Sequence, residues 1–242
     1  MTERRGSSNR LILALPSSAL EHLTRNLDTV ECRRGQVLVD PDTTIEGVFF
    51  PDAGLISVAA VYDGGKIGEV TVIGREGCTG VDAILGADRS CVRMQVQIPG
   101  TAARMPLQGF LEAMESLPEF RAVMYAYAQV YIDELMLSVA CRSAHSLLQR
   151  LARWLLMIRD ACDADDLPVS QQQLAALLGV HRPSITNAAR ELEKMGLIAR
   201  GDRQMTVRDR VALTHAACEC YTRMRARNRH RRIYSISHRR RL

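Results

Sequence analysis

Residues 169–208 read VSQQQLAALLGVHRPSITNAARELEKMGLIARGDRQMTVR, and this stretch decides the predicted fold. Ser170 and Gln173 have the spacing of a capping box, in which the hydroxyl accepts from the backbone N–H three residues on. A helix is therefore expected to start directly after the serine. Gly179 tolerates the positive φ that ends a helix, and Pro183 stands where a second helix can begin. The stretch predicts two helices that meet at a tight turn.

The second half of this stretch separates two interpretations of the helix pair. Apolar or small residues stand where the helices must touch, at Leu174, Ala175, Leu178, Val180, Ile185 and Ala188. An ordinary αα-hairpin inside a helical bundle has the same property. Gly196 then ends the second helix, and residues 197–200 and 205–208 have the character of short strands joined by a turn at Gly201. This continuation favours a winged helix-turn-helix.

These motifs resemble the DNA-binding domain of the Crp/Fnr family of bacterial transcription regulators. In that family the recognition helix commonly opens Ser-Arg-Glu-Thr-Val-Ser-Arg, and the same frame here reads HRPSITN at residues 181–187. The resemblance implies that Arg182 contacts a guanine edge. Pro183 and Asn187 stand where the family has a glutamate and a second arginine, so the operator sequence is expected to differ.

Polar residues of the helix pair and of the wing are the candidates for DNA contact. Arginines on a wing suit phosphate oxygens, and we expect the four arginines 182, 200, 203 and 208 to share one face. A vestigial motif would have no reason to display them together. The candidate set is Ser170, Gln171, His181, Arg182, Ser184, Thr186, Asn187, Arg200, Arg203 and Arg208.

Length and composition are those of a globular protein with room for two domains, since the chain has 242 residues and 47% are hydrophobic. No apolar run approaches membrane-spanning length, and residues 1–10 lack a secretory pattern. We therefore expect a cytoplasmic protein with no membrane partner. The seven cysteines are scattered, with only Cys218 and Cys220 close in sequence, and are expected to be reduced.

The net charge of +5 is concentrated at the C-terminus. Residues 223–242 hold nine arginines and no acidic residue, so the preceding 222 residues hold 23 basic and 27 acidic groups. Two interpretations of this basic tail stay open. It is either a solvated, disordered terminus or a segment that contacts nucleic acid, and its position after the wing favours contact.

The N-terminal half predicts a helical lead-in followed by short strands. Pro16 and Ser17 precede an apolar-periodic run within residues 11–27. Turn residues then separate β-rich segments at 36–39, 46–50, 55–62, 66–73, 91–98 and 101–105. This spacing predicts a small antiparallel barrel or jelly roll. It resembles the cyclic-nucleotide-binding β-roll of the Crp/Fnr family.

The ligand pocket of that roll is only half matched. Family members that bind a cyclic nucleotide carry Gly-Glu for the ribose and, about nine residues later, Arg-Ser or Arg-Thr for the phosphate. Here Val81 follows Gly80, Asp82 arrives one place late, and Arg89 and Ser90 follow after a shorter segment. We predict that neither cyclic AMP nor cyclic GMP is the effector. The alternative role for Arg89 is that of an arginine on a surface turn.

Residues 118–162 contain no glycine, and no proline after Pro118, and their apolar residues recur at helical spacing. One long helix is expected, longer than a small domain can cover. The resemblance implies that it pairs with its twin in a homodimer, with Met124, Tyr127, Tyr131 and Leu135 as dimerisation residues. Residues 163–168, acidic and ended by a proline, are expected to form a hinge.

No catalytic, cofactor or metal site is expected. The six histidines are dispersed, and none lies with cysteines at a zinc-like spacing. His22, Cys78 or Met94 could in principle ligate a haem, but a structural role explains each as well. The chain shows no phosphate loop and no nucleophile motif, so an enzyme is not expected.

The expected fold is α+β, with an N-terminal antiparallel β-roll, a long dimerisation helix and a C-terminal winged helix-turn-helix. The expected boundaries are a disordered N-terminus at 1–10, the roll at 11–117, the helix at 118–162, the DNA-binding domain at 163–222 and the basic tail at 223–242. The resemblance implies double-stranded DNA, a second copy of the chain and RNA polymerase as partners. The alternative function is a small-molecule receptor whose main output is protein contacts.

Overall fold

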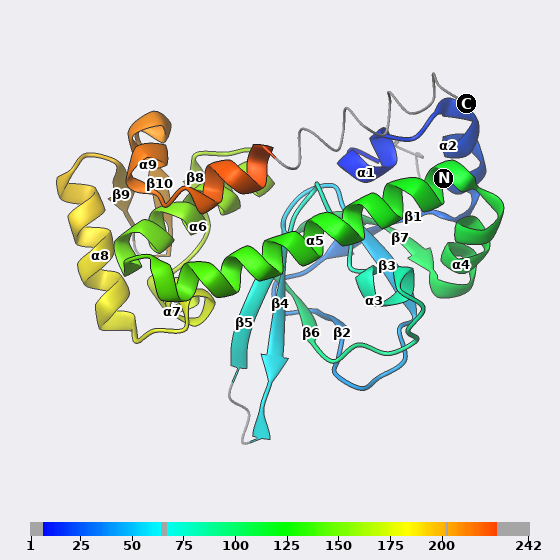
Figure 1. Ribbon diagram of the computed structural model, residues 1–242, viewed down its shortest axis with the longest axis horizontal. Helices are drawn as coiled ribbons and strands as arrows, with labels where there is room; N and C mark the ends of the chain where they lie inside the picture. The colour runs from blue at the N-terminus through cyan, green and yellow to red at the C-terminus, as the bar shows by residue number, and fades with distance from the viewer. Residues whose placement is uncertain (1–6, 64–66, 202, 227–242) are drawn as a thin grey trace. The chain divides into compact units, whose positions relative to one another are not determined.

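The computed structural model divides the chain into two compact units (Figure 1). It describes residues 7–63, 67–201 and 203–226. The first unit contains the described residues through Val58 together with Val72–Ile132, and the second contains Ala59–Thr71 and Asp133–Ala226. None of the helices among the described residues is both long and apolar enough to cross a bilayer. Most of the predicted basic tail, from residue 227 on, lies outside the described residues.

Short strands in two sheets make up most of the first unit, and the segment Ala59–Thr71, counted with the second unit, supplies the end of β4 and most of β5. The strands are β1 (Asp28–Cys32), β2 (Val37–Val39), β3 (Gly47–Pro51), β4 (Leu55–Val61), β5 (Ile67–Ile73), β6 (Arg93–Ile98) and β7 (Gly100–Pro106). The orders are β1-β7-β3 and β2-β6-β4-β5. β1 and β3 pair antiparallel with β7, and β2 pairs antiparallel with β6. The predicted antiparallel roll is confirmed, although β1 was not anticipated.

Alternation along the strands places the core of this unit. Every second residue of β6 is buried, because successive side chains of a strand point to opposite faces. Short helices accompany the strands, and the last of them contacts β3 and β7: α1 (Arg10–Leu13), α2 (Ser17–Leu23), the 3-10 turn η1 (Thr24–Asn26), α3 (Val81–Ile84) and α4 (Leu107–Ser116). Phe110 of α4 meets Phe120 edge to face, with ring centroids 5.5 Å apart.

The folded part of the chain begins nearer the N-terminus than expected, because residues 7–10 were predicted to belong to a disordered terminus. Asn9 is fully buried, and its side-chain amide donates to the carbonyls of Pro51 and Gly77 at 2.9 and 3.0 Å. Its side-chain oxygen accepts from the backbone N–H of Leu11 and caps α1. This asparagine therefore satisfies backbone groups of three segments, which a polar composition could not reveal.

The long helix expected at residues 118–162 is two helices, α5 (Pro118–Ala144) and α6 (Leu147–Cys162). The break has a local cause, because Ser146 and Gln149 form a reciprocal capping box that starts a new helix. This is the same motif that predicted the helix after Ser170. At the other end, Asp163 takes a left-handed conformation, with φ of 53°, and ends α6.

The apolar residues of α5 lie on more than one face of the helix. Met124, Tyr127 and Tyr131 are buried in the chain itself, and the Tyr127 hydroxyl donates to the carbonyl of Cys78 at 2.9 Å. Leu135 is half-buried. The prediction that these four residues form the dimer contact is therefore wrong for the three buried ones. Helical periodicity identified a buried face correctly but assigned it to the wrong partner.

The second unit carries the predicted helix-turn-helix and wing. Its elements after α6 are β8 (Asp166–Leu167), α7 (Gln171–Leu178), α8 (Arg182–Lys194), β9 (Ile198–Arg200), β10 (Met205–Val207) and α9 (Arg210–Ala216). The sheet order is β8-β10-β9, with both pairs antiparallel. The acidic stretch expected to be only a hinge thus supplies an edge strand. Leu174, Ile185, Leu192 and Leu213 are fully buried in this domain's core.

The buried amide of Asn9 makes a testable contribution to the stability of the roll. Asn9→Ala leaves two buried carbonyls without their donor and α1 without its cap, which costs roughly 1–3 kcal/mol. Urea unfolding of the full chain measures the difference. Asn26→Ala, at an exposed position, should change stability by less than about 0.5 kcal/mol. Equal losses in the two variants would show that residues 7–10 do not contribute to the fold.

Candidate nucleic-acid interface

The first helix of the motif is fixed at both ends. Ser170 accepts from the backbone of Gln173 at 3.2 Å while the Gln173 side chain accepts from the backbone of Ser170 at 2.8 Å, so the predicted capping box is confirmed. Gly179 ends the helix with φ of 64°, as expected. Arg150 of α6 donates to the carbonyl of Leu178 at 2.7 Å. An arginine at this end also suits the negative pole of the helix.

The second helix, α8, is held against the first by apolar contacts and by one polar bond. Ile185, Ala188, Ala189 and Leu192 form its buried face. The Thr186 hydroxyl donates to the side-chain oxygen of Gln171 at 2.6 Å. Thr186 and Gln171 were both predicted to contact DNA, and their bond also fixes the angle between the helices. The side chain of Ser170 is likewise engaged within the protein, in the cap.

The outer face of α8 is exposed and carries more basic than acidic side chains. The exposed residues on it are Arg182, Pro183, Asn187, Arg190, Glu191 and Lys194, with His181 just before the helix. The Arg182 side chain forms no hydrogen bond or ion pair with any described residue. Ser184 and Thr186 are half-buried beside it. Arg190 and Lys194 were not predicted, although their spacing from Arg182 and Asn187 places them on the same helical face.

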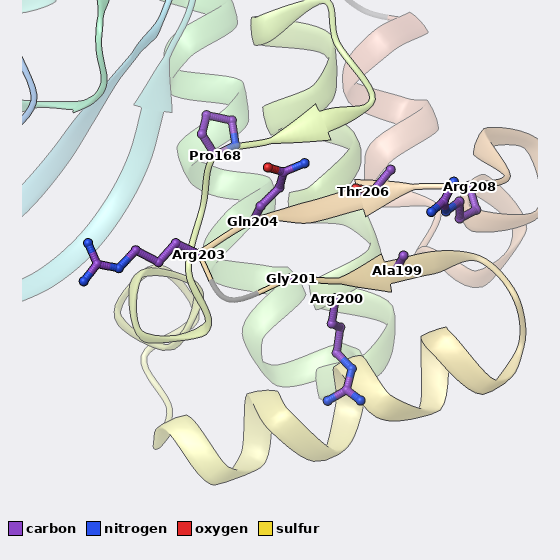
Figure 2. Close-up of a pocket in the computed structure, with 8 residues that line it drawn as sticks. All are labelled: Pro168, Ala199, Arg200, Gly201, Arg203, Gln204, Thr206 and Arg208. Carbon is purple, nitrogen blue, oxygen red and sulfur yellow. The ribbon is translucent and has the colours of Figure 1, made fainter.

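Arg200 departs from the expected arrangement. Its guanidinium pairs with the carboxylate of Glu193, with Nε 2.7 Å from Oε2, and Figure 2 shows the side chain pointing to α8. The cause is strand register: Arg200 lies opposite the buried Met205 in the β9–β10 pair, and opposed residues share a face. The four arginines therefore do not share one face. The hydrogen bond from Arg200 lowers the pKa of the Glu193 carboxyl, which keeps this pair ionised.

The remaining wing arginines stay exposed. Arg203 lies in the turn between β9 and β10, and Arg208 follows β10 on the side opposite Met205. Neither side chain is held by a hydrogen bond or ion pair to another described residue. They line an open hollow of about 520 Å³ on the wing (Figure 2). Its lining residues are Pro168, Ala199, Arg200, Gly201, Arg203, Gln204, Thr206 and Arg208.

The residues of the predicted ligand pocket lie on two segments of the roll. Gly80 precedes α3, and a Cβ there would lie 2.8 Å from the side chain of Val48, so packing alone requires this glycine. Asp82 lies on α3 rather than on an extended segment. On a helix, the one-residue shift turns this side chain by about 100° about the helix axis. Arg89 is exposed and donates to the carbonyl of Asp42 at 2.7 Å, whereas Ser90 is buried.

Comparison with known proteins agrees with this arrangement. Residues 149–216 match the Crp-like helix-turn-helix domain. FixK2 from Bradyrhizobium japonicum superposes with a TM-score of 0.69 at 14% identity, over 79% of this chain and 98% of that one. TTHB099, a transcriptional regulator of the Crp family from Thermus thermophilus, gives 0.63 at 17% identity over 79% and 99%. The c-di-GMP responsive global regulator CLP of Xanthomonas campestris gives 0.61 at 15% identity over 80% and 100%.

No curated protein sequence matches the chain. The chain shares with these structures the order of a β-roll, a long helix and a winged helix-turn-helix. The chain has the Crp/Fnr transcription-regulator fold, and residues 149–216 form a Crp-like helix-turn-helix domain. The resemblance seen in the sequence is thus confirmed by the match of this domain and by the fold.

Proposed function

We propose that the protein is a sequence-specific DNA-binding transcription regulator that binds a roughly palindromic operator as a homodimer. The observation that carries this proposal is the outer face of α8. It presents Arg182 exposed and without an ion-pair partner among the described residues, on a helix whose opposite face is fully buried. A recognition helix needs both properties, because it must be held rigidly while its polar side chains reach base edges in the major groove.

The contacts divide by what they can recognise. Arg182 can donate two hydrogen bonds to a guanine and so specify a base, and Asn187 can pair with an adenine edge. Arg203 and Arg208 of the wing suit phosphates, which fix position without reading sequence. Arg200, neutralised by Glu193, instead holds the wing to α8. RNA polymerase is the further partner that regulation of transcription implies.

A second copy of the chain is the proposed occupant of the exposed side of α5. Tyr125, Met136 and Val139 are 54%, 66% and 73% exposed, which is unusual for large apolar side chains. Together with Gln129 and Ile132 they follow steps of four, three, four and three residues, the spacing of a coiled-coil seam. Two such helices bury the seam by packing on each other, and two recognition helices about 34 Å apart then meet successive major grooves.

The protein is further proposed to bind DNA without cyclic AMP as its effector. Arg89, which the resemblance would place at the cyclic phosphate, already bonds to the carbonyl of Asp42 on an exposed turn. Val81 begins α3 with a buried apolar side chain where the ribose contact is needed. The fold alone does not fix an effector, because the similar structure of CLP belongs to a c-di-GMP responsive regulator.

Arg182→Ala tests the assignment of α8. We expect binding to the preferred operator to weaken by about 1–3 kcal/mol, with relaxed base choice at one position of each half-site. Selection from a random operator library followed by titration measures both effects. Arg203→Ala is the control, and it should weaken binding to all sequences alike. An Arg182→Ala protein that keeps its base preferences would contradict this assignment.

Met136→Glu tests the dimer seam by placing a charge where two apolar faces should pack. The wild-type chain should sediment as a dimer at micromolar concentration, and this variant should sediment as a monomer. Val211→Glu is the matched control, because Val211 is also an exposed apolar residue, 70% accessible, but lies on α9. A Met136→Glu protein that remains as dimeric as this control would exclude α5 as the interface.

Cyclic AMP and cyclic GMP should leave the protein unchanged. A true ligand at a hundredfold excess over its dissociation constant stabilises a fold by about 2.7 kcal/mol, which a thermal melt registers. We expect no rise in melting temperature with either nucleotide, and equal operator affinity with and without them. A rise of several degrees that Arg89→Ala abolishes would show that the pocket binds a cyclic nucleotide.

A further inference from the structure

Four side chains that commonly bind metals meet in the second unit. Cys141 lies in the last turn of α5 and His145 directly follows this helix, whereas Cys218 and Cys220 come from the segment after α9. The sulfur atoms and an imidazole nitrogen all lie within 4.8 Å of one another. The sequence spacing alone did not point to this group, because the fold brings its members together from two segments that are far apart along the chain.

The distances fit a single tetrahedral ion. The Sγ atoms of Cys141 and Cys218 are 3.5 Å apart, and the Sγ of Cys220 is 3.8 Å from the Nδ1 of His145. In a tetrahedron with metal–sulfur bonds of about 2.3 Å, neighbouring ligand atoms are about 3.8 Å apart. Thiolates that hold an iron–sulfur cluster must span its sulfide core, so they need a wider opening.

The alternative is that these cysteines simply pack as small apolar residues, as buried cysteines often do. All three are at most 4% exposed and contact one another, which packing also explains. Packing does not explain the imidazole, whose Nδ1 faces Cys220 while its Nε2 lies 3.1 Å from a carboxylate oxygen of Glu219. A histidine that binds a metal through one nitrogen typically bonds to a carboxylate through the other.

A buried arginine gives a second, independent observation. Arg153 of α6 is 2% exposed, and its Nε has no hydrogen-bond partner in the described part of the chain. The guanidinium donates to the Ser138 hydroxyl at 2.7 Å, and its charge acts on the neighbouring Cys141 and Cys220. A buried cation beside three thiols indicates that negative charge belongs there.

We propose that Cys141, His145, Cys218 and Cys220 form a structural site for one thiophilic divalent ion of the Zn²⁺ type. Each cysteine releases its thiol proton to solvent as its sulfur–metal bond forms, and no oxidant or reductant is required. Three thiolates, a neutral imidazole and a divalent ion carry one net negative charge, which Arg153 balances. Soft thiolate ligands select Zn²⁺ over Mg²⁺ or Ca²⁺.

The site joins segments that are far apart in sequence. Cys141 and Cys218 are separated by 77 positions, so a shared ion cross-links the end of α5 to the segment that follows the winged domain. A polar network holds the same segment nearby, because the Tyr221 hydroxyl donates to Asp160 of α6 at 2.7 Å and Arg225 pairs with that carboxylate at 3.4 Å. The ion strengthens an attachment that these bonds begin.

Metal analysis of the reduced full chain tests the site without any DNA, so its outcome is independent of the proposed function. We expect one Zn²⁺ per chain after equilibration and desalting. Co²⁺ in its place should give the spectrum of a tetrahedral centre with several sulfur-to-metal charge-transfer bands. Cys218→Ser should lose the ion, whereas Cys162→Ser, a thiol of α6 outside the cluster, should retain it. A reduced wild-type chain that takes up neither ion overturns the proposal, as does a Cys218→Ser protein that binds as the wild type does.

A substitution outside the four ligands tests the site while all of its cysteines are kept, so a failure of a cysteine variant to fold cannot affect the result. Glu219→Gln keeps every ligand but weakens the acceptor that orients His145, and it should lower metal affinity about 10- to 100-fold. Competition with a chromophoric chelator measures this change. Glu115→Gln, an exposed carboxylate of α4, is the control and should have no effect. Equal affinity in the two variants contradicts the assignment of His145 as a ligand.

Discussion

The requirement that α5 be covered on two sides constrains the rest of the structure. This helix has 27 residues, which corresponds to a length of about 40 Å. Its buried side is held by the roll, where Tyr127 lies so close to Gly77 that a Cβ there would come within 2.6 Å of the phenol oxygen. Its other side exposes large apolar residues. A helix with two apolar faces is stable in water only if both faces are covered by other parts of the protein or by a partner. The proposed coiled-coil seam follows from this requirement.

Local sequence signals were sufficient to predict a helix end or a turn wherever a single residue provides the hydrogen bond or the φ angle that the backbone needs there. The capping box at Ser170, the left-handed Gly179 and the strand pair of the wing are all where they were predicted. The break before α6 depends on an equally local signal at Ser146, which the strong apolar periodicity on both sides obscured. Helix existence was therefore predictable, and helix continuity was predictable only from the capping residue.

The errors in the site arose where the answer depends on register or on distant contacts. The direction of Arg200 follows from its pairing with Met205, and a one-residue change of register would reverse it. The choice between the two faces of α5 depends on which residues the roll presents to it. The meeting of Cys141 with Cys218 required the winged domain to fold back along α6, because no local spacing relates positions 77 apart.

The junction between α5 and α6 consists of two residues, His145 and Ser146, and each makes a hydrogen bond to the adjoining helix. The backbone N–H of His145 still bonds to Cys141, while the Ser146 cap sets the start of α6. The number of residues in the junction consequently sets the direction in which α6 starts relative to the last turn of α5. Each added helical residue would change that direction by about 100°. A chimaera that exchanges this domain between relatives has to conserve that count, even though the junction resembles an ordinary linker.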